Sequence, residues 1–306
     1  MIDTLVISIG GIKGISFIGV LEELFKKISF KDDIKYIIGS SVGSIIGLLL
    51  TLEYTPDEIF SICTEIDFSK FTLNKCDKLD GCINSEICSL QNLNSFGLDD
   101  CSGMIRLLKS VIHIKCSSNI TFKEHYEKYK KELTIVATDI DDLSAKYFNY
   151  KETPDEQIIN IIKLSISIPI IYIKQNYKNI NYTDGGISNY YPIDYYNLES
   201  SIGICLIKTN ADNIKRKNDD ILNYILNIVN SLEIYMNSLL YKLYTDYTIF
   251  VNTGLMNNDE LKGPGNFGIR LENKNKLYEY GKKQFLVYYK DHKSRFKLNN
   301  KILKKK

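Results

Sequence analysis

The sequence is poor in histidine, and this shortage restricts how a serine could be activated. Its 306 residues include three histidines, at positions 113, 125 and 292. An α/β-hydrolase places its histidine after the serine and the acid in chain order, and only His292 lies late enough for that role. His292 belongs to a strongly basic stretch at the end of the chain. If the protein carries a catalytic serine, we therefore expect its base to be something other than histidine.

Closely paired cysteines are also missing. The seven cysteines stand at positions 63, 76, 82, 88, 101, 116 and 205, with no Cys-x-x-Cys among them. Their odd number and wide spacing argue against a disulfide framework and a zinc module, and favour reduced thiols in the cytoplasm. A metal site between Cys76 and Cys101 is the less favoured alternative, because the short ligand pairs of zinc modules are missing. We find no EF-hand loop either, and we expect no metal and no cofactor.

Hydrophobic runs long enough to cross a membrane are not found in the sequence. The N-terminal segment contains Asp3 and no cationic leader before its apolar residues, so we do not expect a secretory signal. The uncharged stretch from Tyr36 to Leu52 is shorter than a usual span and carries three glycines and three serines. We predict that it forms a buried strand followed by a buried helix.

Charge is distributed unevenly along the chain. The formal net charge is +2, yet residues 282–306 hold ten Lys or Arg and one acid, Asp291, which is a net +9 and leaves −7 for the rest. We predict one catalytic domain over residues 1–290 and a basic tail over residues 291–306. Such a tail can attract an anionic membrane, although a solvated chain end has the same composition. We expect peripheral contact with a membrane and no nucleic-acid partner.

Apolar periodicity predicts an α/β fold. Short β-branched runs alternate with helical patterns, which is typical of a mostly parallel sheet with helices on both faces. The predicted strands are Leu5–Ile9, Tyr36–Ile38, Leu133–Ala137, Ile180–Thr183, Ile202–Ile207 and Thr248–Asn252. Helices are predicted after Gly14 and over Val42–Leu50. No linker divides the chain into two domains.

Three further patterns predict helices and a cap. The sequence "TPDE" occurs at Thr55–Glu58 and at Thr153–Glu156, and each copy has the threonine, proline and glutamate of a helix start. Apolar residues spaced by three and four from Leu222 to Leu243 predict a long helix that packs on the core, with a partner-binding or membrane helix as the alternative. Residues 70–103 lack periodicity and are predicted to cover the sheet edge irregularly.

Ser41 lies between Gly39 and Gly43, after an apolar strand pattern and before an apolar helix pattern. A Gly-x-Ser-x-Gly sequence permits a sharp strand-to-helix turn that exposes the hydroxyl, and the new helix directs its first N–H groups to the same place. A serine is a weak nucleophile until a base accepts its proton and donors stabilise the oxyanion. Ser41 is therefore a candidate nucleophile if two companions exist, and otherwise a small residue in a tight turn.

Candidates for both companions are present. The loop "GGIKG", residues 10–14, joins a predicted strand to a predicted helix and can offer free backbone N–H groups to an anion. It matches neither the dinucleotide loop Gly-x-Gly-x-x-Gly nor a Walker-type phosphate loop. Asp184 ends a predicted strand and precedes Gly185 and Gly186, a pattern that also suits a plain Asp-Gly turn.

Together these three motifs resemble the patatin-like phospholipase family, whose members carry a glycine-rich oxyanion loop, a Gly-x-Ser-x-Gly sequence and a late Asp-Gly-Gly/Ala. The resemblance extends to about Gly281, with weaker similarities such as "SISIP" at Ser165–Pro169. It implies a patatin-like three-layer α/β architecture and a dyad of Ser41 and Asp184. It also implies oxyanion or substrate-binding roles for Gly10, Gly11, Gly14 and Val42. Lys13 stands at the family's basic position.

This sequence departs from the family at Ser8 and Ile9, where Asp-Gly is usual. Backbone donors survive a change of side chain, so we expect an intact oxyanion site, while Ile9 removes a flexible position.

The resemblance implies that the protein is a lipid acyl hydrolase that cleaves acyl esters of phospholipids or other glycerolipids through an acyl-serine. A carboxylate is a weak base, so we expect Asp184 to be partly desolvated. The alternatives are an acyltransferase or transacylase and a non-catalytic lipid-binding member of the fold.

Overall fold

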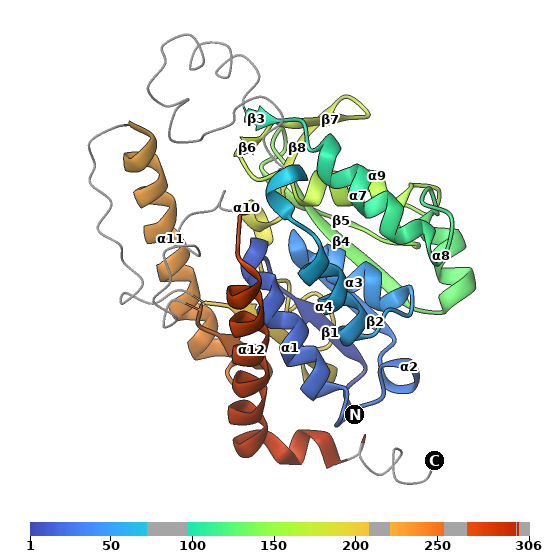
Figure 1. The fold of residues 1–306 in the computed structure, drawn as a ribbon, viewed down its shortest axis with the longest axis vertical. Coiled ribbons are helices and arrows are strands. Elements are labelled where there is room, and N and C mark those ends of the chain that lie inside the picture. Colours follow the sequence, from blue (N-terminus) through green and yellow to red (C-terminus); the bar gives the residue numbers. More distant parts are fainter. Residues whose placement is uncertain (72–96, 208–220, 254–267, 298, 300–306) are drawn as a thin grey trace.

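The computed structural model describes residues 1–71, 97–207, 221–253, 268–297 and 299 (Figure 1). Its centre is an eight-stranded sheet in which seven strands follow the order β10-β9-β1-β2-β4-β8-β7, while β5 pairs with β4. These strands are β1 (Thr4–Ile7), β2 (Tyr36–Ser40), β4 (Glu132–Asp139), β5 (Ser144–Phe148), β7 (Gln175–Tyr177), β8 (Ile180–Asp184), β9 (Ser201–Leu206) and β10 (Thr248–Val251). A second sheet pairs β3 (Gly97–Asp99) with β6 (Ile170–Tyr172).

The main sheet is mixed and mostly parallel. Strands β10, β9, β1, β2 and β4 run parallel to their neighbours in that order, whereas β5 and β8 are antiparallel to β4, and β7 is antiparallel to β8. The register places Ile7 opposite Gly39, so β1 and β2 end at the same edge. The loop at residues 10–14 and Ser41 both follow at this edge, where open parallel sheets place their ligand sites.

Helices cover both faces of the sheet (Figure 1). The helices are η1 (Gly11–Gly14), α1 (Ile15–Leu24), α2 (Phe30–Asp33), α3 (Val42–Thr51), α4 (Pro56–Glu65), η2 (Phe68–Phe71), α7 (Ser102–His113), α8 (Phe122–Tyr129), α9 (Ile158–Ser165), α10 (Gly186–Asn189), η3 (Leu198–Ser200), α11 (Ile221–Tyr244), α12 (Leu271–His292) and η7 (Lys293–Phe296). Side chains alternate across β1, because Leu5 and Ile7 join the larger core with α1, α3 and α12 while Val6 joins a smaller core. The smaller core includes the buried Tyr191, and α11 packs against it through Leu240 and Tyr244. This arrangement confirms the predicted α/β class.

Each predicted strand is found, with ends that differ by no more than two residues. The first "TPDE" copy also starts a helix as predicted, because Thr55 and Glu58 form a capping box at the start of α4. The prediction for the second copy is wrong. The Thr153 N–H instead bonds the Asn149 carbonyl at 2.9 Å, and the Glu156 carboxylate accepts hydrogen bonds from Tyr177 and Lys178, so no capping box forms. Helix α9 begins later, at Ile158.

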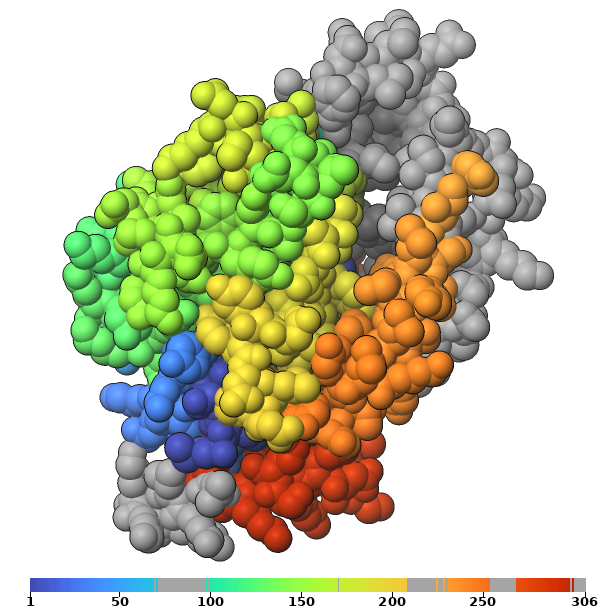
Figure 2. All heavy atoms as spheres, turned by 180° about the vertical axis from the view of Figure 1, so that it is seen from behind, coloured from blue at the N-terminus to red at the C-terminus, as the bar shows by residue number. Residues whose placement is uncertain are grey.

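Helix α11 is present, but its described apolar stripe does not pack on the core as predicted. Leu232, Met236 and Leu243 are 62%, 45% and 65% exposed, whereas Leu240 and Tyr244 pack against the smaller core. The helix therefore meets the body through a neighbouring face, and Figure 2 shows it running along the surface. The side chains of the stripe's first part lie outside those described.

Most of the predicted irregular cap, residues 70–103, also lies outside the described residues, including Cys76, Cys82 and Cys88. Its described ends form parts of η2 and α7 and the short strand β3. The four described cysteines, Cys63, Cys101, Cys116 and Cys205, are free thiols. Among the described helices, none combines the length and hydrophobicity that a bilayer span requires.

The first residues of the predicted basic tail pack against the fold. Phe296 is fully buried, Arg295 donates to the Ser201 carbonyl at 2.8 Å, and the Asn299 side chain bonds the backbone of Ile2 at 3.1 Å. Ser201 starts β9, and Ile2 lies just before β1. The tail thus begins at the edge where the parallel strands start, opposite the edge that carries Ser41. A domain boundary at residue 290 stays a prediction.

Candidate active site

Ser41 lies at the sharp junction between β2 and α3. Its backbone has φ 52° and ψ −126°, a conformation that a residue with a side chain rarely adopts. The residue is 4% exposed. Such backbone conformations persist only where the surroundings enforce them, and they are concentrated at functional sites. This is the sharp turn predicted from the Gly-x-Ser-x-Gly sequence.

The two glycines around Ser41 let α3 lie directly on the strand ends. A Cβ atom at Gly43 would lie 2.3 Å from the Ile7 carbonyl oxygen, and one at Gly39 would lie 2.4 Å from the Gly43 backbone. Both contacts are far below van der Waals distance and involve backbone that cannot swing aside. The glycine spacing is therefore required for close packing of β1, β2 and α3.

The glycine loop forms the neighbouring wall of the site. Gly11 has φ 49°, which favours glycine, and the loop winds into η1 through a hydrogen bond from the Lys13 N–H to the Gly10 carbonyl at 3.0 Å. Within the described residues, no acceptor is found for the N–H groups of Gly10, Gly11 or Val42. Gly14 contacts α3 closely, since a Cβ there would lie 2.8 Å from the Val42 side chain.

The unusual pair Ser8 and Ile9 is accommodated without loss of this loop. The buried Ser8 hydroxyl donates to the Ile9 carbonyl at 2.8 Å and accepts from the Leu206 N–H at 3.0 Å, which fixes the end of β1 to β9. The Ile9 N–H bonds the Tyr190 carbonyl at 3.1 Å. Its side chain lies near Gly186, where a Cβ would meet it at 2.7 Å. The loop and the segment after Asp184 are thus packed together.

Asp184 is the last residue of β8, and the register pairs it with Ala137 of β4. It is 4% exposed, and burial raises its pKa from 3.8 to about 7, although the nearby Ser41 hydroxyl and the Gly186 N–H oppose the rise. Oxygen Oδ1 accepts from the Gly186 N–H at 2.8 Å. Oxygen Oδ2 is buried and has no hydrogen-bond partner among the described residues. The predicted desolvation of Asp184 is therefore present.

Gly185 is required at its position for a steric reason. A Cβ there would lie 2.3 Å from the Val136 carbonyl oxygen and 2.6 Å from the Ser40 hydroxyl. This close approach holds the segment that carries Asp184 against the end of β2, where Ser41 follows. Sequence motifs separated by more than a hundred residues thus meet at one point.

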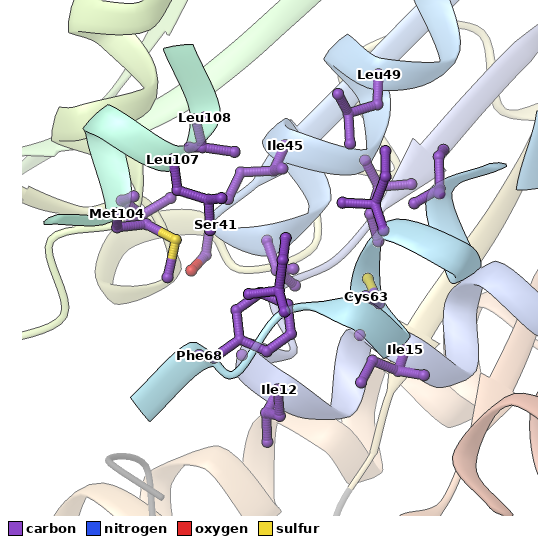
Figure 3. A pocket seen from close by; sticks show the side chains of 18 of the residues that line it. Ile12, Ile15, Ser41, Ile45, Leu49, Cys63, Phe68, Met104, Leu107 and Leu108 are labelled. Carbon is purple, nitrogen blue, oxygen red and sulfur yellow. The ribbon is translucent and has the colours of Figure 1, made fainter. Parts of the chain in front are cut away.

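Ser41 opens into an apolar cavity of about 130 Å³. Figure 3 shows its hydroxyl directed into the cavity next to Met104 of α7, with Phe68 of η2 nearby. The lining comes from η1, α1, α3, α4, η2, α7, the segment around Ile166 and β6. Its residues include Gly11, Ile12, Gly14, Ile15, Val42, Ile45, Leu49, Ile62, Leu107, Leu108, Ile168 and Tyr172. Burial raises the pKa of the Cys63 thiol, which lines the cavity, to about 12, so this thiol stays protonated and uncharged at neutral pH.

The histidines stand apart from this cavity, since none of the three is among its lining residues. Buried His125 contacts the Thr51 hydroxyl at 2.7 Å, and burial lowers its pKa to about 4. His292 stacks on Tyr288 and lies 3.3 Å from Asp246. The described residues contain no group of three or more His, Cys, Asp or Glu side chains that could hold a metal ion. The structure does bring Ser41, Asp184 and the two glycine motifs together.

The cavity walls were not predicted from the sequence, and neither was one polar contact of the site. The Ser41 N–H donates to the Ser165 hydroxyl at 3.0 Å, across a separation of 124 residues. The "SISIP" similarity marks this segment, but nothing local shows that it faces Ser41.

Sequence comparisons find a matching family model and two viral relatives. A family model described as patatin-like phospholipase matches residues 5–196. The chain is 40% identical over 192 residues to a probable lipid hydrolase, 463L, of Invertebrate iridescent virus 6, which covers 62% of each protein. It is 32% identical over 210 residues to the uncharacterized protein R571 of Acanthamoeba polyphaga mimivirus, which covers 66% of this chain and 65% of that protein. The chain thus matches slightly less than two thirds of the length of either relative.

Solved structures share the fold at low sequence identity. VipD from Legionella pneumophila superposes with a TM-score of 0.54 and 14% identity, covering 95% of this chain and 67% of that one. ExoU, in its complex with SpcU from the type III secretion system of Pseudomonas aeruginosa, gives a TM-score of 0.52 and 18% identity, covering 95% of this chain and 52% of that one. At these identities the likeness shows the fold alone.

Proposed function

The chain belongs to the patatin-like phospholipase family, and we propose that it is a lipid acyl hydrolase that works through a Ser41–Asp184 dyad and an acyl-serine intermediate. The observation that carries this proposal is the opening of Ser41 into an apolar cavity beside the buried carboxyl of Asp184. An acyl ester needs both features, since its chain must leave water and its carbonyl must meet an activated nucleophile.

The proposed reaction has two steps. Ser41 Oγ attacks the ester carbonyl carbon while its proton passes to Asp184, and the oxyanion faces the N–H groups of Gly10, Gly11 and Val42. When the carbonyl re-forms, the bond to the alcohol breaks and Asp184 gives the proton to the leaving oxygen. Water then attacks the acyl-serine, again losing a proton to Asp184, and the fatty acid leaves as Ser41 recovers its proton.

The cavity favours an acyl chain over a head group at this end of the substrate. Each methylene transferred from water into such a site contributes about 0.8 kcal/mol. Among the described lining residues, Cys63 and Tyr172 carry the titratable side chains, and burial raises the pKa of both, so they stay neutral. A charged head group would find no charged partner among the described lining residues, so we place it outside the cavity.

We also propose that the protein works in the cytoplasm and contacts membranes peripherally. Its substrate is a phospholipid or another acyl-ester lipid, and it uses no cofactor. The tail begins at the sheet edge opposite Ser41. Its last lysines, Lys301, Lys304, Lys305 and Lys306, would each add about 1 kcal/mol of attraction to an anionic surface. Deleting residues 300–306 should weaken binding to anionic vesicles in sedimentation assays and leave hydrolysis of a water-soluble ester unchanged. Equal vesicle binding by the truncated and the full-length protein would show that the tail does not contribute to membrane contact.

The direct test is product analysis. Wild-type and Ser41→Ala proteins are incubated with mixed phospholipid and neutral-lipid vesicles, and released fatty acid and lysolipid are identified by mass spectrometry. Release by the wild type alone supports hydrolysis at Ser41. Equal release by both proteins would refute the role of Ser41, and release by neither would favour a lipid-binding protein without turnover.

A parallel incubation with an added lysolipid acceptor separates hydrolysis from acyl transfer. A hydrolase delivers the acyl group to water and yields free fatty acid in both incubations. A transacylase would convert the acceptor into a diacyl lipid and yield little free acid.

A further inference from the structure

The backbone of Ser41 is held by a residue from a distant part of the chain. The Ser41 N–H donates a hydrogen bond of 3.0 Å to the Ser165 hydroxyl oxygen, and Ser165 is fully buried at the last position of α9. Ser41 follows β2 directly, so its N–H lies beyond the β2–β4 ladder, which ends at Ser40 and Val136. A buried N–H without an acceptor is unfavourable, and Ser165 supplies the acceptor.

The same segment also holds the strand that carries Asp184. The Ser165 carbonyl accepts from the Gly185 N–H at 3.2 Å, and the Ser167 carbonyl accepts from the Asp184 N–H at 2.9 Å. The Thr183 hydroxyl donates to the Ser167 carbonyl at 2.8 Å. Residues 165–167 therefore contact both members of the proposed dyad. The bonds on the Asp184 side use carbonyl groups, whereas the bond to Ser41 uses a side chain.

We infer that Ser165 is a positioning residue that fixes the Ser41 nucleophile relative to Asp184, an inference that rests on the proposed function. Its hydroxyl oxygen anchors the N–H of a residue whose positive φ must be enforced from outside. The next N–H along the chain, that of Val42, has no acceptor among the described residues and can face an oxyanion. A small displacement of a nucleophile is enough to slow a reaction strongly.

The division between side-chain and backbone bonds permits a clean test. Ser165→Ala removes the acceptor for Ser41 and leaves the carbonyl bonds to Gly185 and Asp184 in place. Ser167→Ala is a matched control, because Ser167 is equally buried but its hydroxyl donates to the Lys163 carbonyl at 2.6 Å. Ser165→Thr keeps an acceptor oxygen and serves as the conservative variant.

The experiment measures two rates across pH, labelling of Ser41 by a fluorophosphonate and hydrolysis of a soluble p-nitrophenyl ester. For Ser165→Ala we expect the high-pH plateau of both rates to fall by roughly 10- to 100-fold, with KM nearly constant. The pH midpoint should stay that of the wild type, because Asp184 keeps its own contacts. Ser167→Ala should behave like the wild type, and Ser165→Thr should recover most of the lost rate.

Three outcomes would overturn the inference. Ser165→Ala reacting as fast as the wild type would show that the hydrogen bond does not position Ser41. Equal losses in Ser165→Ala and Ser167→Ala would show a general structural role of the segment. A Ser165→Thr protein that is as stable as the wild type but as slow as Ser165→Ala would also contradict it. A wild-type protein that neither reacts with the probe nor cleaves the ester would reject the proposed function itself, and the positioning role with it.

Discussion

Ser41 and Asp184 both stand at the end of a strand of the central sheet, yet the protein prepares them differently. Ser41 has a backbone conformation that residues with side chains rarely adopt, enforced by glycine packing and by the bond to Ser165. Asp184 is absent from the residues with positive φ, and its change is chemical, since burial raises its pKa to about 7. The proposed nucleophile is thus prepared by geometry and the proposed base by removal from water.

The largest expected effect comes from removing either member of the pair. Ser41→Ala should lower kcat/KM for a soluble ester by at least about 10³-fold, and Asp184→Asn should lower it by a similar factor because no base remains. Steady-state assays with both proteins, matched for folded content by circular dichroism, provide the measurement. An Asp184→Asn protein that keeps a tenth of the wild-type activity would show that Asp184 is not the base for Ser41.

The pH dependence tests the Asp184 side of the comparison. Asp184 must be ionised to accept a proton, so kcat/KM should fall roughly tenfold per pH unit below about pH 7, where an exposed aspartate would hold it constant to about pH 4. A pH–rate profile from pH 4.5 to 9 gives the midpoint. A midpoint near 4 would show that Asp184 is not the desolvated base.

The same raised pKa has a consequence for stability. The folded state retains the Asp184 proton between pH 3.8 and about 7, whereas the unfolded state loses it, so this group makes the protein less stable as the pH rises through that window. The cost above pH 7 is at most about 4 kcal/mol. Asp184→Asn should therefore raise Tm relative to the wild type at pH 8 and lose that advantage at pH 4, as measured by thermal denaturation.

The geometric side of the comparison is tested at Gly43. Gly43→Ala would place a methyl group 2.3 Å from the Ile7 carbonyl, and the forced separation of α3 from β1 should cost about 1–3 kcal/mol and much of the activity. Gly47→Ala is the control on the same helix, because its Cβ would meet only side chains, Ile37 at 3.0 Å and Leu133 at 3.4 Å. Urea unfolding gives both free energies. Equal stability of the two variants would contradict the packing role of Gly43.

The smallest effects on stability are expected at Ser40 and Ser44, which lie close to Ser41 in the sequence. The Ser40 hydroxyl is buried without a partner among the described atoms, so Ser40→Ala should be neutral or stabilise by up to about 1 kcal/mol. The Ser44 hydroxyl donates to the Ser41 carbonyl at 2.6 Å, so Ser44→Ala should cost about 1 kcal/mol. Denaturant unfolding of both variants tests the difference in sign.

Much of this site could be predicted because its requirements are local. Gly39 and Gly43 lie two residues from Ser41, and Asp184 directly precedes Gly185, so each motif can be recognised within a few residues. The fold class could be predicted because strand and helix patterns alternate regularly along the chain. The helix start at the first "TPDE" copy could be predicted for the same reason, since all atoms of its capping box lie within four residues.

The failures have a common physical cause, which is contact between residues far apart in the chain. The second "TPDE" copy has the same four residues, but Glu156 bonds Tyr177 and Lys178 and cannot cap a helix. The spacing in α11 reveals an apolar stripe without revealing which side meets the body. The role of Ser165 depends on a partner 124 residues away.

The central claim, that Asp184 activates Ser41, is tested most directly by mapping a fluorophosphonate adduct in wild-type and Asp184→Asn proteins by peptide mass spectrometry. We predict a single adduct on Ser41 in the wild type, with a half-maximal labelling rate near pH 7, and at most a trace in Asp184→Asn. An adduct on another residue, or labelling of Ser41 at the same rate in both proteins, would contradict the account.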